Sequence, residues 1–157
     1  MTKIFGTLFI LSASVALGLD LTRREKEKLS VLSALCELIK HILHHVKCFE
    51  SPIDSITSDY KSDALDRCGF GESMRSTSLL CADVGLLPID DAARREFENF
   101  SRGVGRGYRD EELKRCEYYL EYFESALSAE RENFERRRAQ LRYLPLLCGA
   151  AVVIILI

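Results

Sequence analysis

The stretch that decides the fold is LSVLSALCELIKHILHHVKCF, residues 29–49. Its apolar residues recur at alternating spacings of three and four, which places them along one face of an α-helix. They are Leu32, Leu35, Ile39, Ile42, Val46 and Phe49. So narrow an apolar seam is typical of a helix that packs against another helix. We expect this helix to begin near Leu21 and to end before Ser51 and Pro52, because proline disfavours helical geometry at the preceding residue.

A second seam lies in the C-terminal half, where no glycine or proline occurs between Asp110 and Pro145. Its apolar positions, widened by three tyrosines, are Leu113, Cys116, Leu120, Phe123, Leu127, Phe134 and Leu141, with Tyr118, Tyr119 and Tyr122. Glu130 and Arg137 interrupt the seam, and residues 130–142 are strongly charged. We predict a helix roughly 50 Å long, at 1.5 Å per residue, that pairs antiparallel with the first.

Shorter helical signals separate the two seams. Ser51 is the expected N-cap, and Pro52 the first residue, of a helix that ends at Gly69 and Gly71. Its apolar stripe is Ile53, Ile56, Tyr60 and Ala64. Residues 72–84 predict another helix, and Asp90 is the expected cap of a third, with Ala93, Phe97 and Phe100 on its buried face. No segment alternates at period two for long enough to predict a strand, so the expected class is all-α, an antiparallel helical bundle.

Both ends of the chain are apolar. Residues 4–19 and residues 143–157 carry no charge, and each spans roughly 23 Å as a helix, against ~30 Å for a membrane core. We predict two short transmembrane anchors, residues 1–21 and 143–157, around a helical domain at residues 22–142. A cleaved signal peptide with Ser14, Val15 and Ala16 as its cleavage motif is the alternative for the first stretch.

The basic residues beside these stretches predict the topology. Four follow the first stretch and five precede the second: Arg23, Arg24, Lys26 and Lys28, and Arg131, Arg136, Arg137, Arg138 and Arg142. Basic residues concentrate on the cytoplasmic side of membrane helices, so the domain is expected in the cytoplasm and both termini outside.

Composition and cysteine usage exclude several classes of function. The 157 residues are 47% hydrophobic and carry a net charge of −2, which excludes disorder and gives the whole chain no electrostatic reason to bind nucleic acid. Six cysteines without a CxxC pair predict reduced, structural thiols, with Cys116 and Cys148 at apolar positions.

Residues that carry chemistry are scarce. His41, His45 and Cys48 share one side of a helix, and a membrane-anchored metal-binding sensor that uses them is the alternative function. Arg102, Arg106 and Arg109 surround three glycines at alternate positions, but the spacing is not that of a phosphate-binding loop, and we expect a tight interhelical turn. The paired acids at 90–91 and 111–112 suit the positive ends of helix dipoles. We expect no enzyme, no catalytic residue and no cofactor.

In their order along the chain, these pieces resemble the stage III sporulation protein AB family of endospore-forming bacteria. The resemblance rests on the apolar and basic start (residues 4–19, Arg23, Arg24), the leucine-rich helix at 29–42 with Pro52 and Ile53, the segment 100–108 with Val104 and Gly105, and the apolar end with Gly149. Pro145 and Gly107 stand where family members often carry a glycine and an acidic residue.

The resemblance implies a function that the residues alone do not. This family is similar to the F-type platform proteins of type II secretion and type IV pilus systems, and its members are thought to belong to a channel between mother cell and forespore. The implied partners are a secretion-type ATPase, other membrane proteins of the channel, membrane lipid and further copies of the chain. The candidate contact residues are Arg102, Arg106, Arg109, Glu130, Arg131, Glu135 and Arg138. A coiled-coil scaffold unrelated to sporulation is a third interpretation.

Overall fold

The computed structural model describes residues 2–48 and 52–156, and their side chains except those of residues 2–11 and twelve positions after residue 138. It is all-α, and within these residues no strand occurs. The helices are α1 (Thr2–Cys48), α2 (Ile53–Ser58), α3 (Asp63–Arg67), α4 (Phe70–Thr77), the 3₁₀-helix η1 (Val84–Leu86), α5 (Asp91–Gly103) and α6 (Arg109–Leu156). The chain divides into two compact units, Glu27–Ala129 and the pair of terminal segments Met1–Lys26 and Glu130–Ile157.

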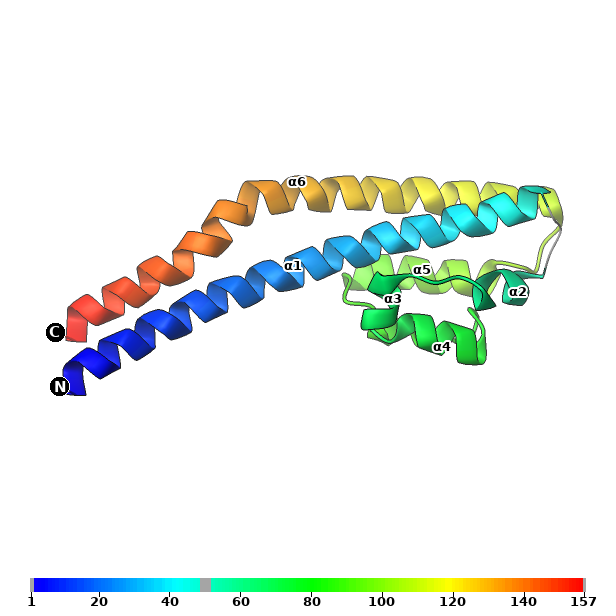
Figure 1. Ribbon diagram of the computed structural model, residues 1–157. Helices are drawn as coiled ribbons and strands as arrows, with labels where there is room; N and C mark the ends of the chain where they lie inside the picture. The colour runs from blue at the N-terminus through cyan, green and yellow to red at the C-terminus, as the bar shows by residue number, and fades with distance from the viewer. Residues whose placement is uncertain (1, 49–51, 157) are drawn as a thin grey trace. The chain divides into compact units, whose positions relative to one another are not determined.

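Two long helices frame the unit Glu27–Ala129, and they run antiparallel (Figure 1). Lys40 pairs with Glu124 at 2.7 Å, and Lys47, two turns further along α1, pairs with Glu117 at 3.3 Å, two turns earlier in α6. The predicted antiparallel pairing is therefore confirmed. In α1 the seam from Leu32 to Val46 is buried as predicted, while Phe49 lies outside the described residues.

Four aromatic rings at the centre of this unit join three helices. Phe97 of α5 lies 5.5 Å from Phe70 of α4, 6.0 Å from Phe123 of α6 and 6.0 Å from Phe100, measured between ring centroids. All four rings are completely buried. The prediction that Ala93, Phe97 and Phe100 form the buried face of a helix is confirmed, and so is burial of Cys116 and Phe123 in α6.

Where the chain contains serines and glycines, the predicted helices are partly wrong. The predicted helix from Ser51 to Gly69 is two helices, α2 and α3, with Pro52 just before the first rather than inside it. The predicted helix 72–84 is α4, which ends at Thr77, and then a turn. The turn begins at Ser78 with a φ of 92°, which buries Leu79 and leaves Leu80 exposed. Hydroxyls near the end of α4 bond to main-chain carbonyls, such as Thr77 to Ser73 at 2.7 Å, and such bonds compete with helix continuation.

Four single-residue expectations also need correction, in full or in part. Gly71 lies inside α4 rather than at a break; a Cβ there would stand 2.0 Å from Oδ1 of Asp66, so the glycine allows α3 and α4 to approach. Asp90 occupies the N-cap position of α5 as expected, but its side chain makes no capping hydrogen bond to α5; its carboxylate accepts a hydrogen bond from Lys28 at 2.8 Å. Tyr118 and Cys148 are exposed.

The second unit consists of the two terminal helical segments, whose ends lie at the same end of the unit (Figure 1). Among the described residues, only the part of α1 within Ser12–Cys48 is long and apolar enough to span a membrane, by length and composition alone, and half of it is buried in protein. Residues 29–46 are the only 18 consecutive residues of this part with no more than two charged side chains, and they contain the buried seam from Leu32 to Val46, so a core helix accounts for the finding as well as a membrane helix does. The predicted C-terminal anchor forms the last turns of α6, where many side chains lie outside those described.

Candidate functional site

The sharpest local feature is the turn between α5 and α6, which was predicted from its three glycines. Gly105 adopts a left-handed φ of +83°, and a Cβ there would lie 2.8 Å from Cγ1 of Ile53 in α2. Both the backbone angle and the close approach therefore require glycine. Residues 104–108 connect the two helices without any helical residue of their own.

A buried carboxylate fixes this turn to the start of α6. Glu112 is 4% exposed and accepts hydrogen bonds from the backbone amides of Gly105 at 3.0 Å and Gly107 at 2.7 Å. Its carboxylate also accepts from Arg115 at 2.6 Å, and Arg115 donates to the carbonyl of Gly103 at 2.6 Å. Because Glu112 lies in the first turn of α6, its charge is also stabilised by the positive end of the helix dipole.

This geometry changes the interpretation of two sequence features. The sequence suggested only a dipole partner in Glu111 and Glu112, whereas Glu112 organises the whole turn. In the sequence, Glu112 lies five residues after Gly107 and seven residues after Gly105. This spacing indicates a contact only once the path of the turn is known. The amides of Gly105 and Gly107 already bind a carboxylate, so they do not offer a phosphate site.

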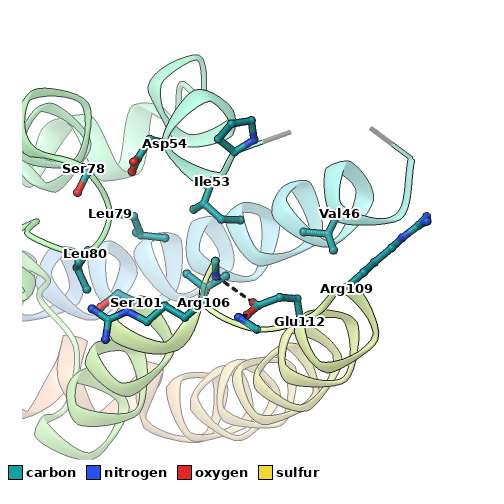
Figure 2. Close-up of a pocket in the computed structure, with 14 residues that line it drawn as sticks. Val46, Ile53, Asp54, Ser78, Leu79, Leu80, Ser101, Arg106, Arg109 and Glu112 are labelled. Carbon is teal, nitrogen blue, oxygen red and sulfur yellow. Dashed lines mark hydrogen bonds between the residues drawn. The ribbon is translucent and has the colours of Figure 1, made fainter. Parts of the chain in front are cut away.

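A cavity of about 440 Å³ opens beside the turn (Figure 2). Its wall combines apolar side chains from α1, α2 and the turn after α4 with the polar groups of the glycine turn. The lining residues are Val46, Pro52, Ile53, Asp54, Ser78, Leu79, Leu80, Ser101, Val104, Gly105, Arg106, Gly107, Arg109 and Glu112. The contributions of α1, α2 and residues 78–80 were not predicted, because they depend on how the short helices fold back.

The three predicted arginines of the turn have different surroundings. Arg106 lines the cavity, is exposed and makes no hydrogen bond or ion pair with any residue in the described part of the chain. Arg109 also contributes to the lining, but it donates to the carbonyl of Lys47 and Figure 2 shows it pointing away from the cavity. Arg102 is not part of the lining and pairs with Glu98 at 2.5 Å. Of the three arginines, only Arg106 thus brings an uncompensated charge to the cavity, where the carboxylate of Asp54 also forms part of the lining.

The second predicted contact group lies in the unit of terminal segments. Glu130, Arg131, Glu135 and Arg138 follow one another along α6, and the guanidinium of Arg138 lies 3.9 Å from the carboxylate of Glu135. Arg131, Glu135 and Arg138 are exposed. A role for these residues in partner binding stays a prediction.

The histidine cluster does not converge on a metal. The ring centroids of His41 and His45 are 4.5 Å apart, and His41 also packs beside Tyr60 at 5.2 Å, while Cys48 is exposed. Burial lowers the pKa of His41, and the nearby His45 adds to this shift. Within the described residues, no group of three His, Cys, Asp or Glu side chains is placed to hold a metal ion. The metal-sensor alternative therefore gains no support from the geometry.

Comparison with known proteins identifies the second half of the chain. Residues 82–157, which contain η1, α5, the glycine turn and α6, match the family model described as Stage III sporulation protein AB. Over this segment, just under half of its residues, the chain is similar to the Stage III sporulation protein AB family. The match begins at Ala82, so it does not extend to the N-terminal part of the resemblance. Neither the curated proteins nor the solved structures contain a match.

The Stage III sporulation protein AB segment includes the residues whose hydrogen bonds hold the turn. Gly105, Gly107, Glu112 and Arg115 all lie within residues 82–157, as do all seven predicted contact residues. The cavity beside the turn is completed by α1, α2 and residues 78–80, which precede the segment. A candidate docking site is thus built partly from the family segment and partly from the preceding helices.

Proposed function

We propose that this protein is a non-enzymatic membrane platform of a secretion-like sporulation channel between mother cell and forespore. The observation that carries the proposal is the Stage III sporulation protein AB family match over residues 82–157. In this function the helical domain lies in the mother-cell cytoplasm and couples a secretion-type ATPase to the membrane proteins of the channel. No step of chemistry is needed, because the work is done by docking surfaces.

Exposed apolar side chains support two membrane anchors. Seven of the eleven exposed large hydrophobic residues among the described side chains lie in the unit of terminal segments. They are Val15, Leu17, Leu19 and Leu21 from α1, and Tyr143, Leu144 and Leu147 from α6. Leucines that are more than 60% exposed, such as Leu19 and Leu147, are unfavourable in water but suit lipid. In the proposed function both anchors lie in the membrane that surrounds the forespore.

The topology is tested with reporter fusions to the full chain in a sporulating bacterium. A reporter that is active only outside the cytoplasm is fused after Ile157, and a second copy is inserted at the exposed Lys61 of the central unit. We expect activity from the first fusion and none from the second. A cytoplasmic reporter at Ile157 would contradict the proposed arrangement, and recovery of the protein in the soluble fraction would contradict the anchors.

For the ATPase we propose the cavity beside the glycine turn as the docking site. It combines apolar walls with the charge of Arg106, and interfaces are enriched in arginine beside apolar anchors. The test is capture of a secretion-type ATPase of the same sporulating bacterium by the full-length protein in detergent. Arg106→Ala is expected to reduce capture at least fivefold, as loss of a contributing interface arginine does.

Arg102→Ala is the matched control for this experiment. Arg102 is an exposed arginine of the same segment, but it pairs with Glu98 and does not line the cavity. It is expected to leave capture unchanged. Equal capture by wild type and Arg106→Ala would place the ATPase on another surface, such as the charged face at residues 130–138.

A further inference from the structure

The net charge of the whole chain is only −2, but its two units carry net charges of opposite sign. The unit Glu27–Ala129 contains 13 basic and 19 acidic residues, a net charge of −6. The terminal segments Met1–Lys26 and Glu130–Ile157 contain nine basic and five acidic residues, a net charge of +4. The unit that carries the apolar ends is therefore the one with a net positive charge.

Several basic side chains of this unit are exposed and lie close to the apolar stretches. Lys26 is seven residues from Leu19, and Arg137 is six residues from Tyr143, which correspond to roughly 10 Å and 9 Å along a helix. These distances are about one Debye length at physiological salt. An anionic group at the edge of an apolar stretch is therefore still attracted by these basic side chains. Arg23, Arg24, Arg136 and Arg138 occupy the same zones and are exposed as well.

Ion pairs within the unit do not neutralise this surface. Arg24 pairs with Asp20 and Arg136 with Glu132, each with the basic side chain about 75% exposed. Lys26 and Arg137 are exposed and make no hydrogen bond or ion pair with any side chain that the structure describes. Their full charge is therefore available to an external anion.

We infer that the basic residues beside the two apolar stretches bind the phosphate groups of anionic phospholipids. The inference rests on the membrane anchoring within the proposed function, and it adds the lipid class that the protein selects. Basic residues next to a membrane segment attract anionic headgroups, and the attraction falls away within a Debye length.

The experiment measures lipid preference by native mass spectrometry of the full-length protein in mild detergent. Phosphatidylglycerol and phosphatidylcholine are added in equal amounts, and the ratio of their bound adducts is recorded. We expect a clear preference for phosphatidylglycerol in the wild type. Arg137→Gln is expected to lower this preference about fivefold, the effect of one basic residue near an anionic surface.

Arg131→Gln provides a control on the same helix. Arg131 is exposed, makes no hydrogen bond or ion pair with the described residues, and carries the same charge as Arg137. It is twelve residues from Tyr143, about 18 Å, which is beyond the Debye length. Its replacement is expected to change the lipid preference less than twofold. Equal effects of the two variants, or no preference in the wild type, would overturn the inference.

Two further readouts separate the alternatives. Inorganic phosphate at the same concentration should not displace phosphatidylglycerol; if it does, the residues form a site for free phosphate and the lipid inference is wrong. A wild type that is membrane-anchored by the reporter assay but shows no lipid preference refutes this inference alone. A protein found outside the membrane refutes the proposed function as well.

Discussion

Glu112 illustrates how one side chain can determine a loop and a helix together. Its carboxylate is buried, yet each oxygen accepts a hydrogen bond from a backbone amide of the turn, and one also accepts from Arg115. Burial of a charge is costly unless it is hydrogen-bonded in this way. The turn therefore depends on this carboxylate, although the sequence marks it only as one acid among several.

Glu112→Gln is expected to lower the free energy of unfolding by about 1.5–3 kcal/mol. The variant places an amide NH₂ group beside one of the two backbone N–H donors and removes the charge from the bonds with the turn and Arg115. Denaturant unfolding of the full-length protein in detergent measures the change. Glu111→Gln, at an exposed neighbour, should stay within about 0.5 kcal/mol. Equal destabilisation by both variants would contradict the role of Glu112.

His41 predicts a dependence of stability on pH. Its pKa is lowered by burial and by the neighbouring His45, so the unfolded chain binds this proton more readily than the folded chain. The stability contribution is present above the unfolded pKa of about 6.5 and is lost as the pH falls below it. Between pH 7 and pH 5.5 the unfolding midpoint should fall in the wild type.

The slope of this decrease should be smaller in His41→Gln. His44→Gln, at an exposed position one helical turn further along α1, should retain most of the wild-type slope. Thermal unfolding of the full chain at several pH values is the measurement. Identical slopes in the wild type and His41→Gln would show that other groups set the acid sensitivity.

At the scale of elements, the sequence predicted long helices well and short ones poorly. The seams of α1 and α6 repeat over many turns, so their burial and their pairing could be read from spacing alone. The break between α2 and α3 and the end of α4 could not, since they depend on how Leu65, Phe70 and Leu79 enter a core supplied by other helices. The cavity could not be predicted for the same reason, because residues 78–80, which follow α4, form one of its walls.

Phe97 holds α4, α5 and α6 together, and its removal should affect all three. Phe97→Ala leaves a void between Phe70, Phe100 and Phe123 and should destabilise the central unit by about 3–5 kcal/mol. Phe97→Leu, which keeps most of the volume, should cost much less. Far-ultraviolet circular dichroism during denaturant unfolding gives both values. A loss below 1 kcal/mol for the alanine variant would contradict the central position of this ring.

At the scale of the whole molecule, six free cysteines report on the accessibility of different regions. Cys48 and Cys81 are exposed, whereas Cys116 is completely buried in α6. Burial and the nearby charge of Glu112 raise the pKa of Cys116 to about 12, so its thiolate form is rare at neutral pH.

Alkylation at pH 7.5 should therefore modify Cys48 and Cys81 within minutes and leave Cys116 intact until the central unit unfolds. Peptide mass spectrometry at increasing denaturant concentration measures each site. The midpoint for Cys116 should coincide with that of global unfolding, as expected for a buried group exposed only by complete opening. Modification of Cys116 together with Cys81 in native buffer would show that α6 separates from the core locally.

The antiparallel pairing of α1 with α6 has a consequence for synthesis of the chain. Leu35 and Ile39 leave the ribosome long before Phe123, which belongs to the same core. At about 5–20 residues per second, the early helix waits roughly four to eighteen seconds for the later one. During that interval its apolar face has no partner, and a nascent chain in this condition is prone to aggregate. Insertion of the preceding apolar stretch into the membrane would keep neighbouring nascent chains apart until the second long helix arrives.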